Sequence, residues 1–278
     1  QYLEYCADQR LAQLGLPRVP FPGGTVAGTI DRVRGTIDPV VEDVERSLVG
    51  LREARLEKLV RANPRILELT RDGHPARRGE LLVFDPGDLT LSGLRAVGFR
   101  KIGEETIEGL DLSVTRLQLP SGVRLRDVAP LMERVAPGVQ WAPDHIYEQA
   151  GRAPTAPVSS AAASVIAAHV GVIDGGPGAG QVVAASKGFA SGAPAASNHG
   201  SAIVSLLKRA GVRSIAVADV YGTDPAGGSA TAVARGLGWL VTGGAKVVTI
   251  SLVGPNNLLL ARAVASARQK GTVIVAAV

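Results

Sequence analysis

The second half of the chain carries two hydrophobic periods that alternate. Short runs rich in Val and Ile have the length and composition of strands buried on both faces. These runs are Val170–Ile173, Ser214–Ala218, Lys246–Ile250 and Thr272–Ala277. Between them, apolar residues recur at helical spacing in His199–Ala210, Ser229–Thr242 and Asn257–Lys270. Strands that alternate with helices predict an α/β fold, with a doubly wound, mostly parallel sheet. Functional groups are then expected at the carboxyl ends of its strands.

Residues 79–149 show a different pattern, typical of a small α+β domain. The predicted elements are a strand at Glu80–Phe84, a helix over Leu89–Val97, a strand over Leu112–Leu119, a helix over Val128–Val135 and a last strand that starts at Val139–Trp141. With one further strand between the two helices, the element order is β-α-β-β-α-β, which suits a ferredoxin-like domain with two helices on one face of an antiparallel sheet.

The remaining segments complete a four-part organisation. In residues 1–75, Asp38 as N-cap and Pro39 as first helical residue predict an amphipathic helix from about 38 to 62, which Pro64 ends. Residues 150–162 are small, Pro-containing and aperiodic, and are interpreted as a linker. The strand–helix alternation then occupies residues 163–278.

Composition narrows the classes of function. The chain has 278 residues, of which 46% are hydrophobic, so it can bury a sizeable core. Its single cysteine, Cys6, excludes an internal disulfide framework and a cysteine-based zinc cluster. No apolar run has the roughly 20 residues that a transmembrane helix requires.

Charge divides unevenly between the two halves. Residues 1–150 hold 20 Lys and Arg against 22 Asp and Glu, whereas residues 151–278 hold 10 against 3. The basic residues are scattered and almost no aromatic residues accompany them, so no nucleic-acid partner is expected. Two domains of opposite sign that attract each other explain the asymmetry.

Three residues are candidates for chemistry. Asp174 directly follows an apolar strand, at the sheet edge where function concentrates, although a turn or cap aspartate would look the same. His199 opens a helix, where the positive helix end favours a neutral, basic imidazole; a buried structural histidine is the alternative. Ser251 ends another strand but lies in no nucleophile elbow, so we interpret it as lining a substrate site. Gly175–Gly180 fits a phosphate-binding loop poorly, because no helix is expected directly after it.

Together these segments resemble the subtilisin-like serine proteases. Val170–Gly176 resembles the motif around the catalytic Asp, and His199–Val204 resembles the motif around the catalytic His, with Ser201 in place of Thr. Lys246–Leu252 with Gly254 and Pro255 resembles the strand that binds the substrate backbone, and these pieces occur in the family's order.

The resemblance implies a precursor of a serine endopeptidase. Asp174 and His199 would be two members of the Ser-His-Asp triad, and Ser251, Leu252, Val253 and Gly254 would bind an extended polypeptide substrate. Residues 79–149 would be an inhibitory propeptide, a partner in cis, and a cut would fall between Tyr147 and Arg152. Such enzymes are commonly exported, to the medium, periplasm or cell envelope. No cofactor is expected; calcium sites occur in the family, but Asp219 and Asp224 alone do not define one.

Two departures from the family pattern shape the expectation. Val253 stands where the family usually has Gly, which would narrow the substrate cleft. The family's oxyanion Asn and catalytic Ser would follow residue 278, so we expect a truncated, inactive chain whose edge residues Ile274 and Val275 promote aggregation. The alternative is a non-enzymatic pseudoprotease or protease-inhibiting module that acts through the propeptide-like domain.

Overall fold

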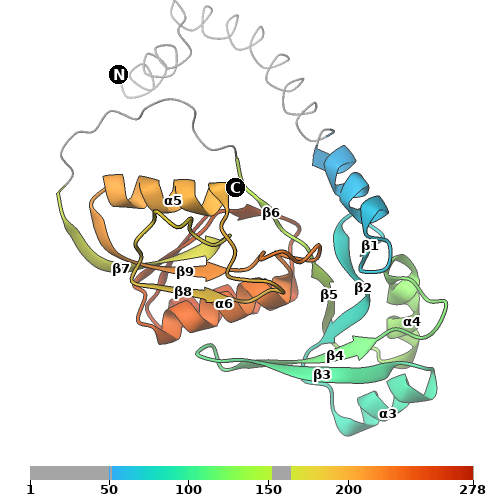
Figure 1. Cartoon of the computed structure of the whole chain (residues 1–278). Coiled ribbons are helices and arrows are strands. Elements are labelled where there is room, and N and C mark those ends of the chain that lie inside the picture. The colour runs from blue at the N-terminus through green and yellow to red at the C-terminus, as the bar shows by residue number, and fades with distance from the viewer. Residues whose placement is uncertain (1–49, 51, 152–163, 278) are drawn as a thin grey trace, which may run out of the picture. The chain divides into compact units, whose positions relative to one another are not determined.

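The computed structural model describes residues 50, 52–151 and 164–277 (Figure 1). The chain divides into two units at residue 55, and nearly all of the described residues belong to the second. Residues 50 and 52–62 are helical, and this helix stops before Pro64, as the sequence predicts. The rest of the predicted helix and nearly all of the predicted linker lie outside the described residues.

The first part of the larger unit is an antiparallel sheet with two helices. Its elements are β1 (Leu67–Leu69), β2 (Pro75–Val83), α3 (Asp88–Ala96), β3 (Arg100–Ile107), β4 (Leu112–Gln118), the 3-10 turn η1 (Leu125–Asp127), α4 (Val128–Val135) and β5 (Trp141–His145). The sheet runs β1-β2-β4-β3, and β5 also pairs with β2. From β2 to β5 the element order is β-α-β-β-α-β.

The two faces of this sheet have different partners because side chains alternate along each strand. Leu81 and Val83 of β2 pack with Leu94 of α3 and with Met132 of α4, so both helices cover the same face. Leu82 and the residue after the strand, Phe84, point the other way and join the core of the following α/β part.

The second part is a parallel α/β sheet. Its elements are β7 (Ile166–Asp174), β8 (Ala185–Gly188), α5 (Asn198–Arg209), β9 (Val212–Asp219), α6 (Ala230–Thr242), β10 (Val247–Ile250), α7 (Leu258–Gln269) and β12 (Val273–Ala276). The strands lie in the order β12-β10-β7-β9-β8, and every neighbouring pair is parallel. The predicted mixed α/β fold with a mostly parallel sheet is confirmed.

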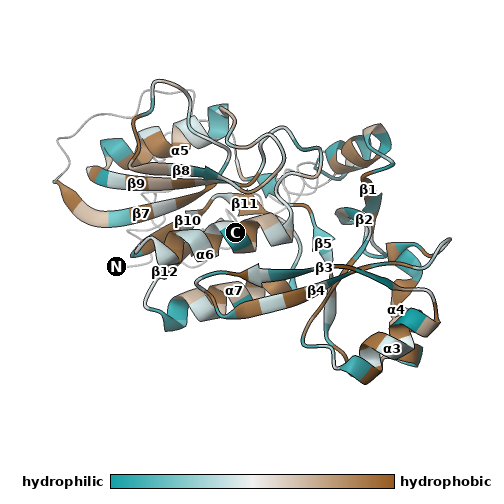
Figure 2. Ribbon diagram, turned by 60° about the horizontal axis from the view of Figure 1, so that its bottom comes forward, coloured by the Kyte–Doolittle hydropathy of each residue, from teal (hydrophilic) through white to brown (hydrophobic). Residues whose placement is uncertain are grey.

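Helices cover both faces of the parallel sheet. Val204 of α5 packs on Val170, Val172 and Val217 on one face. On the other face, α6 and α7 lie against residues such as Ala218 and Val248. Both helices also contact the antiparallel sheet, so they lie between the two sheets (Figure 2). This position explains why α6 is apolar around most of its circumference.

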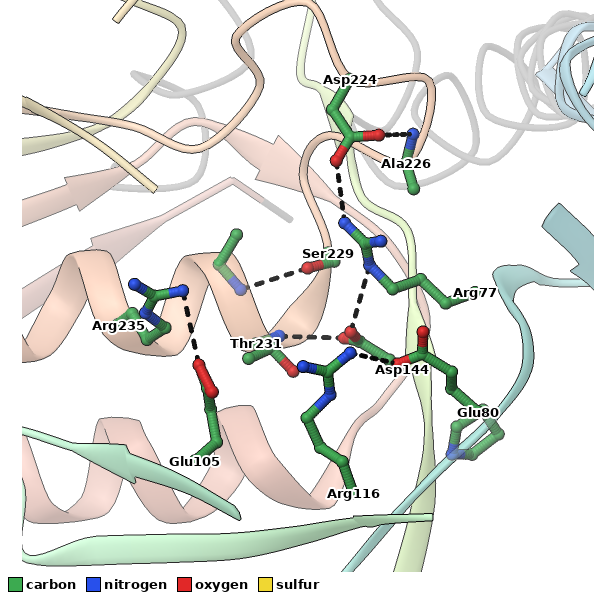
Figure 3. Close-up of polar contacts among 12 residues, drawn as sticks. Arg77, Glu80, Glu105, Arg116, Asp144, Asp224, Ala226, Ser229, Thr231 and Arg235 are labelled. Atoms are coloured by element: carbon green, nitrogen blue, oxygen red, sulfur yellow. Dashed lines mark hydrogen bonds and ion pairs between the residues drawn. The ribbon is translucent and has the colours of Figure 1, made fainter. Parts of the chain in front are cut away.

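A buried polar network ties the antiparallel sheet to the N-terminus of α6 (Figure 3). Asp144 of β5, 1% exposed, accepts a hydrogen bond of 3.0 Å from the Thr231 N–H in the first turn of that helix. Arg77 of β2 lies 3.6 Å from Asp144 and donates to Asp224 at 2.9 Å. Burial raises the pKa of Asp144 to about 6, against the opposing effects of Thr231 and Arg77.

Candidate active site

Asp174 lies at the carboxyl end of β7, the central strand of the parallel sheet, and is fully buried. Its Oδ1 accepts hydrogen bonds from the Gly175 N–H at 2.6 Å and from the Gln149 side chain at 2.9 Å. Its Oδ2 lies 2.7 Å from His199 Nδ1. Burial raises the pKa of Asp174, and these hydrogen bonds oppose part of the rise because they favour the carboxylate.

His199 is the second residue of α5, and the local sequence sets its position. The Ser197 side chain caps the helix by accepting a hydrogen bond from the Gly200 N–H. This start places the imidazole over the end of β7, with Nδ1 directed at Asp174. Its Nε2 lies 2.8 Å from the carbonyl oxygen of Ala150. The two residues that the sequence singled out, 25 positions apart, therefore form one hydrogen-bonded pair.

Glycines allow α5 to approach the end of β7 this closely. A Cβ on Gly200 would lie 2.1 Å from the Gly175 carbonyl oxygen, and a Cβ on Gly175 would lie 2.5 Å from the Ser197 Cβ. A Cβ on Gly176 would meet the Ala195 carbonyl oxygen at 2.5 Å. The segment after Gly180 is not helical. The start of the glycine-rich segment is thus explained by close backbone packing, and it lacks the following helix that a phosphate loop requires.

The four predicted substrate-lining residues lie beside an extended segment of the same chain. β11 (Leu252–Val253) pairs antiparallel with β6 (Glu148–Gln149), with Leu252 opposite Gln149 and Val253 opposite Glu148. The Ala150 N–H extends the ladder to the Ser251 carbonyl oxygen at 2.8 Å. The branched side chain of Val253 therefore leaves room for a bound strand.

Tyr147 anchors the other end of this segment. Its N–H donates to the Gly228 carbonyl oxygen at 2.8 Å, its carbonyl accepts from the Tyr221 hydroxyl at 2.9 Å, and its own hydroxyl donates to the Pro255 carbonyl oxygen at 2.6 Å. A Cβ on Gly254 would lie 2.2 Å from the ring, so glycine makes room for the aromatic side chain. Burial raises the pKa of the Tyr147 hydroxyl, which keeps it a neutral donor.

Residues 147–150 thus lie along β11 and end at the Asp174–His199 pair, and we call the position that this segment occupies the cleft. A carboxylate bonded to Nδ1 orients the imidazole in the way that general-base catalysis of acyl transfer requires. In this structure the Nε2 N–H donates to the Ala150 carbonyl oxygen, which can only accept. Within the described residues, no serine hydroxyl contacts the His199 ring. Arg152, the far limit of the predicted cut, lies outside the described residues.

Sequence reasoning missed two polar residues of the site, Gln149 and Ser197. Gln149 belongs to a two-residue strand that no periodicity reveals. Ser197 was detectable, because a serine just before an apolar helical run is a common N-cap. Asp219 and Asp224 receive donors from the protein itself: three backbone N–H groups bond to Asp219, and Arg77 and the Ala226 N–H bond to Asp224.

No family model matches the sequence, and no curated protein matches it. Among solved structures, the fold is similar to fervidolysin from Fervidobacterium pennivorans, a keratinolytic enzyme related to subtilisin. The TM-score is 0.54 at 16% identity over 76% of this chain and 42% of that chain. The epidermin leader peptide processing serine protease (EpiP) from Staphylococcus aureus matches at a TM-score of 0.39 and 10% identity, over 72% of this chain and 59% of that chain.

The first of these likenesses defines the class of fold. A similarity at 16% identity shows shared architecture and no more, and the second, at a TM-score of 0.39, is too weak to support an argument. The chain therefore has a subtilisin-like fold, and it spans less than two-thirds of either of these two proteins. Among the described residues, no helix is long and apolar enough to cross a membrane.

Proposed function

We propose that the protein is the precursor of a subtilisin-like serine endopeptidase. Asp174 and His199 are two members of its triad, and Ser251–Gly254 bind an extended peptide. Residues 79–149 act as an inhibitory propeptide in cis, and the precursor is exported. The third member of the triad, a serine, is not among the residues of this chain. In this form the chain is inactive, because its cleft is filled and its nucleophile is not in place.

One observation carries the proposal: the Asp174–His199 pair lies at the end of a cleft that holds a peptide strand, with the Ala150 carbonyl 2.8 Å from His199 Nε2. In acyl transfer, His199 would take the proton of the serine hydroxyl as that oxygen attacks the carbonyl carbon, and would then give it to the leaving amine. Asp174 would hold the ring and stabilise the imidazolium. The carbonyl nearest to His199 belongs to the Ala150–Gly151 bond, which we take as the scissile bond, inside the predicted interval from Tyr147 to Arg152. Its oxygen would turn away from Nε2 when the serine hydroxyl bonds there.

The test is peptidase activity of the full-length gene product, from start codon to stop codon. We expect it to hydrolyse a fluorogenic peptide that ends in Tyr-Glu-Gln-Ala and to react with a fluorophosphonate probe. His199→Ala should lower kcat/KM by at least about 10³-fold, because the remaining site lacks its base. His169→Gln is the matched control, since His169 bonds to Ser214 away from the cleft and its loss should change kcat/KM by less than about 3-fold.

A gene product that neither hydrolyses the peptide nor reacts with the probe would overturn the proposal. The same filled cleft favours the second candidate, a non-enzymatic inhibitor or binding module. In that case the folded gene product should inhibit an added subtilisin-type protease without showing activity of its own.

A further inference from the structure

The side chain of Gln149 makes a contact that backbone pairing does not require. Its amide nitrogen lies 2.9 Å from Asp174 Oδ1 and 3.1 Å from Ser197 Oγ. A side-chain amide nitrogen has two N–H donors, and here each has one acceptor. Among the described residues of the bound strand, Gln149 is the one whose side chain reaches the Asp174 carboxylate.

We propose that this contact makes the cleft selective for glutamine at the position of Gln149. This position directly precedes Ala150, whose carbonyl oxygen lies next to His199. The inference rests on the proposed function, and it names the substrate class: peptides with Gln as the second residue before the scissile bond. Gln149 is a specificity-determining residue of the bound segment.

The surroundings of Asp174 explain the selectivity. The carboxylate is fully buried, so a donor that is lost from Oδ1 is not replaced cheaply by solvent. Methionine at this position has similar length but offers no donor. Glutamate would place a second carboxylate against the buried one, and asparagine is one methylene too short to reach both acceptors.

The acceptor side of the contact is rigid. Ser197 Oγ accepts from the Gly200 N–H at the start of α5, and Asp174 is held by the Gly175 N–H and by His199. If Ser197 Oγ or the Asp174 carboxylate moved to meet a shorter or differently charged side chain, the helix cap or the Asp174–His199 pair would be disturbed. The position therefore discriminates by geometry as well as by charge.

The first test needs no catalytic activity. In the 278-residue chain, hydrogen exchange of the Ala150 amide, which bonds to Ser251, reports how often the strand leaves the cleft. We expect Gln149→Met to accelerate this exchange by about 10- to 100-fold, as for loss of a hydrogen bond to a charged group, and Gln149→Glu by more. Gln140→Met is the matched control, since Gln140 contacts Arg262 far from the cleft, and should change the rate by less than about 3-fold.

The second test uses the full-length gene product and peptides that end in Tyr-Glu-X-Ala. Replacing Gln by Met at X should lower kcat/KM by about 10-fold or more, and Glu should lower it further. Unchanged exchange in both Gln149 variants, or equal kcat/KM for Gln and Met, would overturn the inference. A clear exchange effect together with no hydrolysis of any peptide would instead refute the proposed function and leave strand selectivity in place.

Discussion

At the scale of single residues, the candidate site and the contact between the two sheets each contain a buried, hydrogen-bonded carboxylate. Asp174 has three partners, Gly175, Gln149 and His199, and Asp144 has Thr231 and Arg77. The position after an apolar strand was enough to select Asp174 from the sequence. Asp144 carries no such signal, because its burial results from the packing of β5 against α6.

Asp144 and its neighbour His145 should give the molecule opposite responses to pH. Burial raises the pKa of Asp144 to about 6. Burial, followed by the charge of His74, lowers the pKa of His145 to about 4, and His145 Nδ1 accepts from the Asn257 side chain. Glu80 and Arg77 are the other charged groups whose fields act on Asp144.

For Asp144, the folded state binds the proton more readily than the unfolded state. Its stabilising contribution is therefore present at about pH 4 and is lost as the pH rises through about 6. We expect the free energy of unfolding of the unsubstituted chain, minus that of Asp144→Asn, to rise by about 2 kcal/mol as the pH falls from 7 to 4. Urea unfolding across this range measures it.

His145→Gln provides the contrast with the opposite sign. Neutral His145 contributes stability above about pH 6.5, and this contribution is lost as the pH falls through about 4. The difference between the unsubstituted chain and this variant should therefore shrink over the same range. Parallel slopes for the two variants would contradict the assignment of either group.

At the scale of elements, the site depends on α5 meeting the end of β7 without intervening side chains. Strand and helix limits in this part follow from local patterns, so α5, α6, α7, β9 and β10 fall within about two residues of their predicted spans. The strand β3 was not located from the sequence: most of Arg100–Ile107 is polar and exposed, and its pairing with β4 makes it a strand.

Gly200→Ala tests this approach of helix to strand. The added methyl group would lie 2.1 Å from the Gly175 carbonyl oxygen, so α5 must shift and carry His199 away from Asp174. We expect a loss of about 1–3 kcal/mol in the free energy of unfolding, as for other overpacked sites. The signal of the His199 Nδ1 proton shared with Asp174 should also weaken in proton NMR.

Gly180→Ala is the control for that variant. A Cβ at Gly180 would meet nothing within 4 Å, and its backbone does not have the left-handed conformation that favours glycine. Its free energy of unfolding should stay within about 0.5 kcal/mol of the unsubstituted chain. An equal effect at both glycines would show that the close contact at Gly200 is unimportant.

At the scale of the whole molecule, described residues of the antiparallel and parallel parts form ion pairs across their contact. The ion pairs that join the antiparallel part to the parallel part are Arg77–Asp224, Arg235–Glu105, Arg262–Asp85 and Lys270–Asp111. The carboxylate lies on the antiparallel part in three of them and on the parallel part in the pair Arg77–Asp224. Asp85 and Asp111 are mostly exposed, so their pairs contribute little stability. The shared apolar core between α6, α7 and the antiparallel sheet contributes the larger share.

The edge of the parallel sheet predicts how the 278-residue chain behaves in solution. β12 is an edge strand in the described structure, and Val273 and Val275 on it are 57% and 53% exposed. An exposed apolar edge promotes strand-to-strand association. Val275→Lys should therefore reduce the oligomeric fraction seen by analytical ultracentrifugation at a given concentration.

The matched variant is Val182→Lys. Val182 is 84% exposed but lies outside every strand, so a lysine there adds the same charge without altering an edge. Association that falls equally in both variants would point to net charge, and the edge explanation would then be wrong.

The amino-acid sequence by itself determined the parallel α/β class, the order β7, α5, β9, α6, β10, α7 and β12, and the two positions Asp174 and His199. These features are local, because each depends on only a few neighbouring residues. They are the hydrophobic period, the helix caps, and the first residue after a strand or at the start of a helix. Only the tertiary structure decided that Asp174 and His199 touch, that Gln149 reaches the same carboxylate, and that β6 lies on β11, 103 positions away along the chain. Such contacts depend on how distant segments pack. The hydrophobic period within one segment does not indicate which other segment it will contact.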